Sequence, residues 1–248
     1  MTSYISDLHT DLITIDTPQM IEVDRLMMEE YGIQLIQMME NAGRALAILT
    51  KERFCDGDVE GKKIAVLAGT GGNGGGALVA ARRLHTWGAQ VEVFTTADID
   101  KFTPIPSHQL AIVKRMGIKI KVGHELPQNT PFHAILDGII GYSLKGNPYG
   151  VAENLIEWAN NQNTPIVSLD TPSGLDLNSG TLYKPTIEAK ATLTLALPKM
   201  GLFANKAKKV IGELYLGDIS VPTELYNEKT LDIVMENVFR YSDIIRIH

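Results

Sequence analysis

Three segments of the chain combine turn-forming residues with a polar side chain that could bind or transform a ligand. The first is the glycine-rich run from Gly69 to Gly76, which contains Asn73. The second begins at Asp137 and the third at Asp170. Each follows a short apolar run of the kind that forms a strand buried on both faces. Because ligands bind at the carboxyl ends of parallel strands, we expect the three segments to meet in one crevice.

The glycine run is suited to holding an anion. Glycine allows the backbone to approach a ligand closely, and the N–H groups at the start of a helix favour a phosphate. The run matches GxGxxG at Gly69, Gly71 and Gly74, but no Gly-Lys-Ser/Thr follows, so it is not a P-loop. The pattern predicts a nucleotide-binding turn, with a flexible glycine turn as the alternative.

The two aspartates have different neighbours. Asp137 could hold a cation, a ribose hydroxyl or a proton, or it could only cap a turn. Asp170 is followed by a Pro-Ser-Gly turn, and a rigid turn after a carboxylate is what a positioned acid or base requires. Lys199 also follows a predicted strand, where it could face the crevice or extend along the surface.

The elements that would position these residues alternate between strands and helices. Short apolar runs predict strands, and helical spacing of apolar residues predicts helices between them. This alternation predicts an α/β fold: a Rossmann-like, doubly wound, mainly parallel sheet in three α/β/α layers. The predicted strands are 64–68, 91–94, 118–122, 134–136, 166–169, 191–197 and 212–216, and the helices are 78–87, 109–116 and 149–160.

The N-terminal part of the chain adds two further helices to this pattern. Apolar residues recur at helical spacing over 17–32 and again over 33–53. Thr17 is the expected N-cap of the first helix, with Pro18 in its first turn. Residues 1–16 have no clear period and are expected to form an irregular arm. The chain as a whole, 1–248, is expected to form a single domain.

Composition excludes several classes of function. The net charge of −6 gives no general attraction for nucleic acid, and no apolar run reaches the length of a bilayer span. Cys55 is the only cysteine, so no disulfide framework exists, and the histidines show no metal-binding spacing. We therefore expect a cytoplasmic protein that binds neither nucleic acid nor a membrane.

Taken together, the motifs are similar to those of one known family. The chain resembles the YjeF N-terminal domain family, the NAD(P)H-hydrate epimerases, from about Ile15 to Tyr226. Five motifs in the same order carry the resemblance: Met39-Glu40-Asn41-Ala42-Gly43, the glycine run with Leu78-Val79-Ala80-Ala81-Arg82, the Asp137 segment, Asp170-Thr171-Pro172-Ser173-Gly174-Leu175-Asp176, and Leu197-Pro198-Lys199-Met200-Gly201-Leu202.

The resemblance implies roles for particular residues. It implies a potassium ion, whose surroundings match Asn73, Asp137 and Ser173, and oxygen ligands of this kind suit a hard cation. It also implies that the glycine run contacts the dinucleotide, that a second segment lines the substrate, and that Asp170 touches it. The implied substrate-binding residues are Gly72, Asn73, Gly74, Gly75, Gly76, Gly141, Tyr142, Ser143, Leu144, Lys145, Gly146, Asn147 and Asp170.

The implied activity is an isomerisation in nicotinamide-dinucleotide repair. The substrate would be hydrated NADH or NADPH, and exchange of its R and S forms needs one group to protonate oxygen and another to take a proton back. Asp170 is the candidate acid–base residue. An ATP- or ADP-dependent NAD(P)H-hydrate dehydratase would act as a separate protein, because this chain ends at His248. Apolar positions on the N-terminal helices could support a homodimer.

Two other functions stay open at this stage. The family loop usually reads Gly-x-Gly-Asn-Asn-Gly-Gly-Asp-Gly, and Gly72 and Gly76 replace an Asn and an Asp here. This departure favours a non-catalytic nucleotide-binding or scaffold module as the alternative. A Rossmann dehydrogenase would need an acidic residue at the end of the second strand. Thr95 and Thr96 stand there instead, with Asp98 slightly later.

Overall fold

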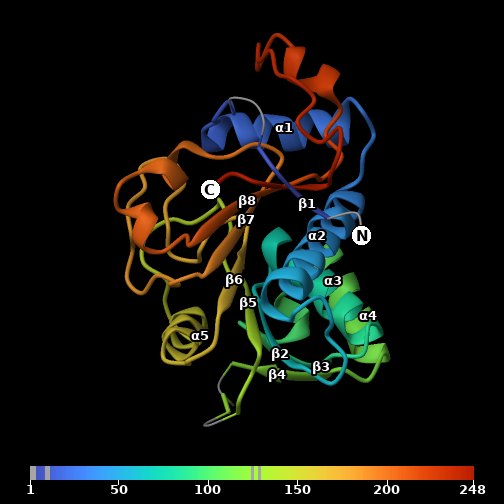
Figure 1. Ribbon diagram of the computed structural model, residues 1–248, viewed down its shortest axis with the longest axis vertical. Helices are drawn as coiled ribbons and strands as arrows, with labels where there is room; N and C mark the ends of the chain where they lie inside the picture. The colour runs from blue at the N-terminus through green and yellow to red at the C-terminus, as the bar shows by residue number, and fades with distance from the viewer. Residues whose placement is uncertain (1–3, 9–11, 124–125, 128–129) are drawn as a thin grey trace.

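A nine-stranded sheet forms the centre of the protein in this computed structural model (Figure 1). The structure describes residues 4–8, 12–123, 126–127 and 130–248. The strand order is β1-β9-β8-β7-β6-β5-β2-β3-β4, and every neighbouring pair is parallel except β8 with β9. The strands are β1 (Ile5–Asp7), β2 (Lys63–Ala68), β3 (Gln90–Thr95), β4 (Lys119–Val122), β5 (Ala134–Gly138), β6 (Ile166–Leu169), β7 (Ala191–Leu195), β8 (Glu213–Gly217) and β9 (Ile244–Arg246).

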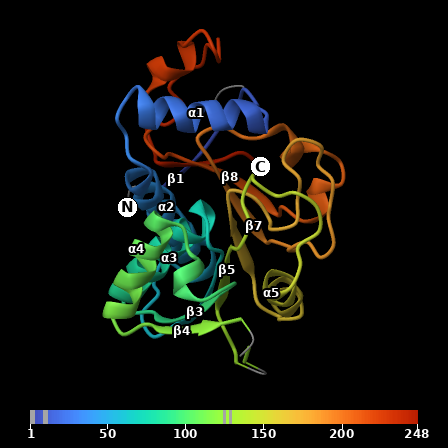
Figure 2. The same ribbon diagram turned by 180° about the vertical axis from the view of Figure 1, so that it is seen from behind.

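Helices cover both faces of this sheet, as the sequence predicted. Helices α2, α3 and α4 lie together on one side and α5 lies on the other (Figures 1 and 2). Helix α1 crosses one end of the sheet beside the segment that follows β8. The helices are α1 (Thr17–Glu29), α2 (Leu35–Phe54), α3 (Gly72–Thr86), α4 (Pro104–Arg115) and α5 (Val151–Asn160). None of the described helices is long and apolar enough to cross a bilayer.

Strand β2 shows why the central strands read as continuous apolar runs. Successive side chains of a strand point to opposite faces. Ile64 and Val66 pack in the main core under α2 and α3, whereas Ala65 and Leu67 pack in a second core under α5. Both faces are buried, so the strand has no polar alternation.

The order in which successive strands are added to the sheet reverses at β2, which has β3 on one side and β5 on the other. Chain order runs outward from this point in both directions, through β3 and β4 and through β5 to β8. A crevice forms at such a switch point, outside the carboxyl ends of the two strands. The ends of β2 and β5 are the predicted positions of the glycine run and of Asp137.

The structure corrects the predictions at the N-terminus. The predicted irregular arm, 1–16, contains β1, which pairs with β9; residues 1–3 and 9–11 lie outside the described residues. The N-cap of α1 is Asp16, whose side chain accepts from the Gln19 N–H at 2.7 Å, and not Thr17, which is the first helical residue. Aspartate caps as well as threonine does, so the sequence fitted both positions.

Candidate functional site

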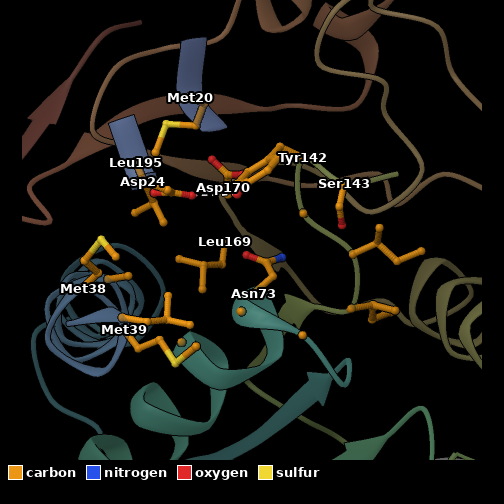
Figure 3. Close-up of a pocket in the computed structure, with 18 of the residues that line it drawn as sticks. Met20, Asp24, Met38, Met39, Asn73, Tyr142, Ser143, Leu169, Asp170 and Leu195 are labelled. Carbon is orange, nitrogen blue, oxygen red and sulfur yellow. Dashed lines mark hydrogen bonds between the residues drawn. The ribbon is translucent and has the colours of Figure 1, made fainter. Parts of the chain in front are cut away.

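One cavity of about 440 Å³ lies at the switch point of the sheet. Its volume falls within the usual range for small-molecule sites, about 300–1,000 Å³. Asn73, Gly141 and Asp170 all line it, so the three segments singled out in the sequence do meet. Figure 3 shows Asn73 facing a group formed by Asp24, Tyr142 and Asp170, with Met38 and Met39 on a neighbouring wall.

The glycine run contributes the start of helix α3. The helix begins at Gly72, six residues before the predicted start at Leu78, so the second half of the run is helical and not a loop. Its N-cap, Gly71, has no side chain to cap the first turn. The N–H groups of a first turn lack partners within the helix and favour an anion. Gly72, Asn73 and Gly76 line the cavity.

The glycines of this turn permit close packing. A Cβ on Gly74 would lie 1.9 Å from the Gly69 carbonyl oxygen, and one on Gly75 would lie 2.7 Å from Met39 Sδ. On Gly76 it would lie 2.7 Å from Leu169 Cδ2, whereas on Gly72 it would meet nothing closer than 3.9 Å. Gly74 and Gly75 do not line the cavity, and their contact with substrate stays a prediction.

Asp170 and Lys199 form a buried ion pair on the cavity wall. Lys199 Nζ donates to Asp170 Oδ1 at 2.7 Å and to the Leu195 carbonyl oxygen at 2.9 Å. Asp170 is 4% exposed and Lys199 0%. Asp170 Oδ2 receives no hydrogen bond from the described residues. Lys199 therefore faces the crevice, and one oxygen of Asp170 is free to meet a ligand.

The backbone at Asp170 holds the carboxylate in place. Asp170 directly follows β6 and has φ of +62°, in the left-handed region that costs a non-glycine residue of order 1–3 kcal/mol. Its N–H donates to the Leu193 carbonyl oxygen at 2.7 Å. Strained backbone of this kind gathers at functional sites, where surrounding structure fixes it.

Gly141 keeps open the space between Asn73 and Asp170. A Cβ on Gly141 would lie 3.4 Å from Asn73 Cβ and 3.6 Å from Asp170 Oδ2. These are ordinary contact distances, so a side chain there would fill the gap without a clash.

Asp137 and Ser173 come together beneath the cavity and do not line it. The fully buried Asp137 carboxylate accepts from Ser173 Oγ at 2.6 Å, Ser173 N at 2.9 Å, Ser168 Oγ at 2.8 Å and Ile139 N at 3.2 Å. Burial raises the pKa of Asp137 in spite of these donors. No lysine or arginine pairs with it among the described residues.

Only part of the second predicted segment reaches the cavity. Gly141, Tyr142 and Ser143 line it. The remaining four do not, and Asn147 turns away to accept from the Lys184 N–H at 3.1 Å. Contact of Leu144, Lys145, Gly146 and Asn147 with substrate stays a prediction.

Sequence reasoning missed Asp24, which lines the cavity from α1. Tyr142 donates its hydroxyl to Asp24 Oδ2 at 2.6 Å. Burial raises the pKa of Asp24, and burial also raises that of Tyr142. One signal was available: Asp24 lies four residues after Met20 and three before Met27, which places a carboxylate on the apolar face of the helix.

The dehydrogenase alternative finds no support at the end of β3. Thr96 lines the cavity, but Asp98, the nearest acidic residue, is not among the described residues that do so. Among the residues that the structure describes, no carboxylate at the end of β3 or directly after it lines the cavity to bind a cofactor ribose.

Comparison with known proteins finds a matching family model and several similar curated proteins. A family model described as YjeF-related protein N-terminus matches residues 35–201. The chain is 42% identical over 217 residues to the NAD(P)H-hydrate epimerase of Dehalogenimonas lykanthroporepellens. The aligned region covers 88% of this chain and 86% of that protein. It is 34% identical over 218 residues to the bifunctional NAD(P)H-hydrate repair enzyme Nnr of Moorella thermoacetica, covering 85% of this chain and 41% of that protein.

A solved structure shares the fold. The crystal structure of yeast YNL200c matches with a TM-score of 0.79 at 23% identity, over 95% of this chain and 100% of that one. The mainly parallel sheet with helices on both faces is therefore a known arrangement, as the sequence predicted. Asp24 lies before the region matched by the family model, whereas Asp170 and Lys199 lie within it.

Proposed function

Because this chain belongs to the YjeF-related N-terminal family, we propose that it is an NAD(P)H-hydrate epimerase, an isomerase that interconverts the R and S forms of hydrated NADH or NADPH. One observation carries the proposal: a buried carboxylate–ammonium pair, Asp170 with Lys199, presents a free carboxylate oxygen to a ligand-sized cavity at the switch point. Relatives of similar length named as epimerases support it.

The reaction requires proton transfer and no redox change. The two epimers differ at the ring carbon that bears the added hydroxyl. Exchange breaks and remakes the C–O bond, or opens and closes the ring, and either route needs a group that gives a proton to oxygen and one that takes a proton back. Asp170 is the acid–base residue, acting through its free Oδ2. Lys199 holds the other oxygen and so fixes the direction of the carboxylate.

The dinucleotide would enter with its phosphates near the start of α3. The uncapped first turn of that helix offers backbone N–H groups and a favourable dipole to an anion. The mixed lining of the cavity, with Met38, Met39 and Leu169 beside the polar groups, suits an aromatic or reduced ring. Asn73 and Ser143, which line the cavity, would bind polar groups of the substrate.

The residues around Asp137 fit a monovalent cation. Asp137 is a buried carboxylate without a cationic partner among the described residues, and an amide nitrogen of Asn73 is buried without a hydrogen bond. The two atoms of such an amide can be exchanged, which would turn an oxygen toward a cation. We propose that Asn73, Asp137 and Ser173 surround a potassium ion. Its charge would offset that of Asp137 and order the loops beside the substrate.

A dehydratase is the expected partner in the pathway. The bifunctional relatives are named as NAD(P)H-hydrate repair enzymes, and this chain spans less than half of their length. We propose that an ATP- or ADP-dependent dehydratase consumes the S form and that the epimerase supplies it from the R form. A coupled assay that consumes both epimers only when both proteins are present checks this arrangement.

The direct test is the rate of R–S interconversion of hydrated NADH and NADPH. The rate is measured first with potassium chloride and then with tetramethylammonium chloride at equal ionic strength. We expect a rate well above the spontaneous one that falls when potassium is replaced. A folded protein with no rate above background would favour the alternative, a nucleotide-binding module without catalysis.

The role of Asp170 is tested by Asp170→Asn, which we expect to lower kcat by roughly 10²–10⁴-fold. Asp100→Asn makes the same chemical change at an exposed position outside the cavity and serves as the control. If the Asp170→Asn variant epimerises the substrate at nearly the wild-type rate, Asp170 is not the acid–base residue.

A further inference from the structure

The cavity contains a second carboxylate, Asp24, with the same hydrogen-bonding pattern as Asp170. Asp24 Oδ2 accepts from the Tyr142 hydroxyl at 2.6 Å, and its Oδ1 receives no hydrogen bond from the described residues. Asp170 likewise has one oxygen held by Lys199 and one free. Each carboxylate is fixed through one oxygen and can offer the other to a ligand.

The two carboxylates come from different parts of the fold and have different partners. Asp24 extends from α1 and Asp170 follows β6, yet Figure 3 shows them converging on the same cavity with Tyr142. Asp170 is paired with an ammonium group and Asp24 with a phenol. When two titratable groups in one site have unlike surroundings, they are suited to act as acid and base.

Titratable groups from four other segments of the fold interact electrostatically with Asp24. They are Tyr142 on the segment after β5, Asp170 after β6, Lys199 after β7 and Tyr226 after β8. Burial raises the pKa of Asp24, which favours a proton on this carboxyl relative to an exposed aspartate. With Oδ2 held by Tyr142 and Oδ1 open to the cavity, Asp24 can carry a proton at a higher pH than an exposed aspartate does.

The stereochemistry of the reaction gives such a second group a role. The hydroxyl lies on opposite faces of the ring in the two epimers, so one carboxylate would serve both only if the ring turned over within the cavity. We propose that Asp24, held by Tyr142, is a second catalytic acid–base residue that serves the ring face Asp170 does not. This inference rests on the proposed function.

The step is balanced in atoms and electrons. The protonated carboxyl on one face gives its proton to the hydroxyl, and the C–O bond breaks with its electron pair on the departing water. The ring nitrogen lone pair forms a double bond to the ring carbon and carries the positive charge. A water adds to that carbon from the other face, and the second carboxylate takes its proton. One water leaves, one enters, and no oxidant is required.

Oxygen exchange separates the two faces. Each purified epimer is incubated with enzyme in oxygen-18 water, and label and configuration are followed together. We expect the wild-type protein to label and epimerise both forms. Asp24→Asn should lower epimerisation by roughly 10²–10⁴-fold but still label one epimer with retained configuration, because Asp170 continues to exchange oxygen on its own face. Asp170→Asn should label the other epimer instead.

Two further variants complete the design. Tyr142→Phe keeps both carboxylates and should slow, but not abolish, labelling of both epimers. Glu29→Gln changes a carboxylate to an amide at an exposed position of the same helix as Asp24, and its labelling and epimerisation should match the wild type.

Folding of Asp24→Asn is checked by thermal unfolding. Because the folded state binds the Asp24 proton more tightly than the unfolded chain, wild-type stability falls as pH rises through the raised pKa. The amide avoids this loss, so the variant should be at least as stable at neutral pH.

Each contrary result has a distinct meaning. If Asp24→Asn loses labelling of both epimers equally, Asp24 only positions the substrate and the inference is wrong. Epimerisation by the wild type without uptake of solvent oxygen would exclude the two-face route while leaving the epimerase proposal intact. If the folded wild type neither labels nor epimerises, the proposed function itself fails.

Discussion

Among the ion pairs of the described residues, Asp170 with Lys199 is the one in which both side chains are almost fully buried, at 6% and 1% exposure. A buried pair of this kind contributes little net stability relative to apolar residues, because both charges lose their hydration. Removing one partner is costly, however, because the other charge stays buried. The pair is therefore better explained by the fixed position it gives to Asp170 than by the stability it adds.

This cost can be measured with a double-mutant cycle. Lys199→Met should lower the free energy of unfolding by about 3–5 kcal/mol, since it leaves the Asp170 carboxylate buried and unpaired. The double variant Lys199→Met with Asp170→Asn should recover much of that loss in urea unfolding. Additive effects of the two substitutions would show that the two side chains do not interact energetically.

Gly141 is expected to matter for binding and not for folding. An alanine Cβ would make ordinary contacts with Asn73 and Asp170 in the empty cavity. The free energy of unfolding of Gly141→Ala should therefore lie within about 0.5 kcal/mol of the wild-type value. The same methyl group would fill the gap between Asn73 and the free oxygen of Asp170, where we expect the substrate to bind. We expect KM to rise roughly ten-fold, equivalent to about 1.4 kcal/mol. An unchanged KM would place the reacting ring elsewhere in the cavity.

At the level of elements, helices α2 and α3 approach each other through glycine. A Cβ on Gly43 would lie 2.4 Å from the Gly76 carbonyl oxygen and 2.5 Å from Val79 Cβ. Neither backbone nor a β-branched side chain can move aside cheaply. This close approach holds the first turn of α3, and with it Asn73, against the cavity.

Substitution of two glycines separates packing from helix propensity. Gly43→Ala should lower the free energy of unfolding by about 1–3 kcal/mol, because the added methyl overpacks the contact. Gly72→Ala, at the open first position of α3, should be neutral or slightly stabilising, as alanine favours helix over glycine. Equal effects at the two positions would mean that the α2–α3 contact can relax.

These same contacts explain which elements the sequence could predict. Strands β2, β5 and β6 were predicted because a strand buried on both faces needs a continuous apolar run, and the chain supplies one. The start of α3 was predicted six residues late, since glycine disfavours helix locally. Tertiary packing against Gly69, Met39 and Leu169 overrides that preference, and no local pattern reports it.

Long-range pairing limited the prediction in the same way elsewhere. Strands β1 and β9 have three residues each, too few for a periodic signal, and they pair across nearly the whole length of the chain. At the site, Asp170 was found because it follows a buried strand and opens a turn sequence. Asp137 was predicted to follow its strand as well, but β5 extends through Asp137 to Gly138. Asp24 was missed because a single acidic residue on a helix is usually solvent-exposed, and only the packing of α1 over the cavity places it inside.

At the scale of the whole molecule, a few polar contacts beside the switch point tie neighbouring segments of the sheet together. The Asp137 carboxylate binds donors from β6 and from the Pro-Ser-Gly turn that follows it, so it ties the end of β5 to the segment that carries Asp170. A cation at this position would bind the folded state only. Its binding free energy would then add to the stability of the whole domain.

Potassium should therefore raise the thermal stability of the protein in proportion to its binding. At ten times its Kd, a ligand specific for the folded state adds about 1.4 kcal/mol, and a domain of this size gains ~2–4 °C in Tm per kcal/mol. We expect an increase of roughly 3–6 °C in potassium chloride relative to tetramethylammonium chloride at equal ionic strength, a comparison that cancels charge screening. Asn73→Ala and Ser173→Ala should each reduce this difference in Tm between the two salts. The two salts are compared for each variant separately, so a lower overall stability of the variant does not affect the result. An equal Tm in the two salts for the wild type would show that no potassium ion binds at this site. Asp137 would then act only as the buried hydrogen-bond acceptor that joins β5 to the Asp170 segment.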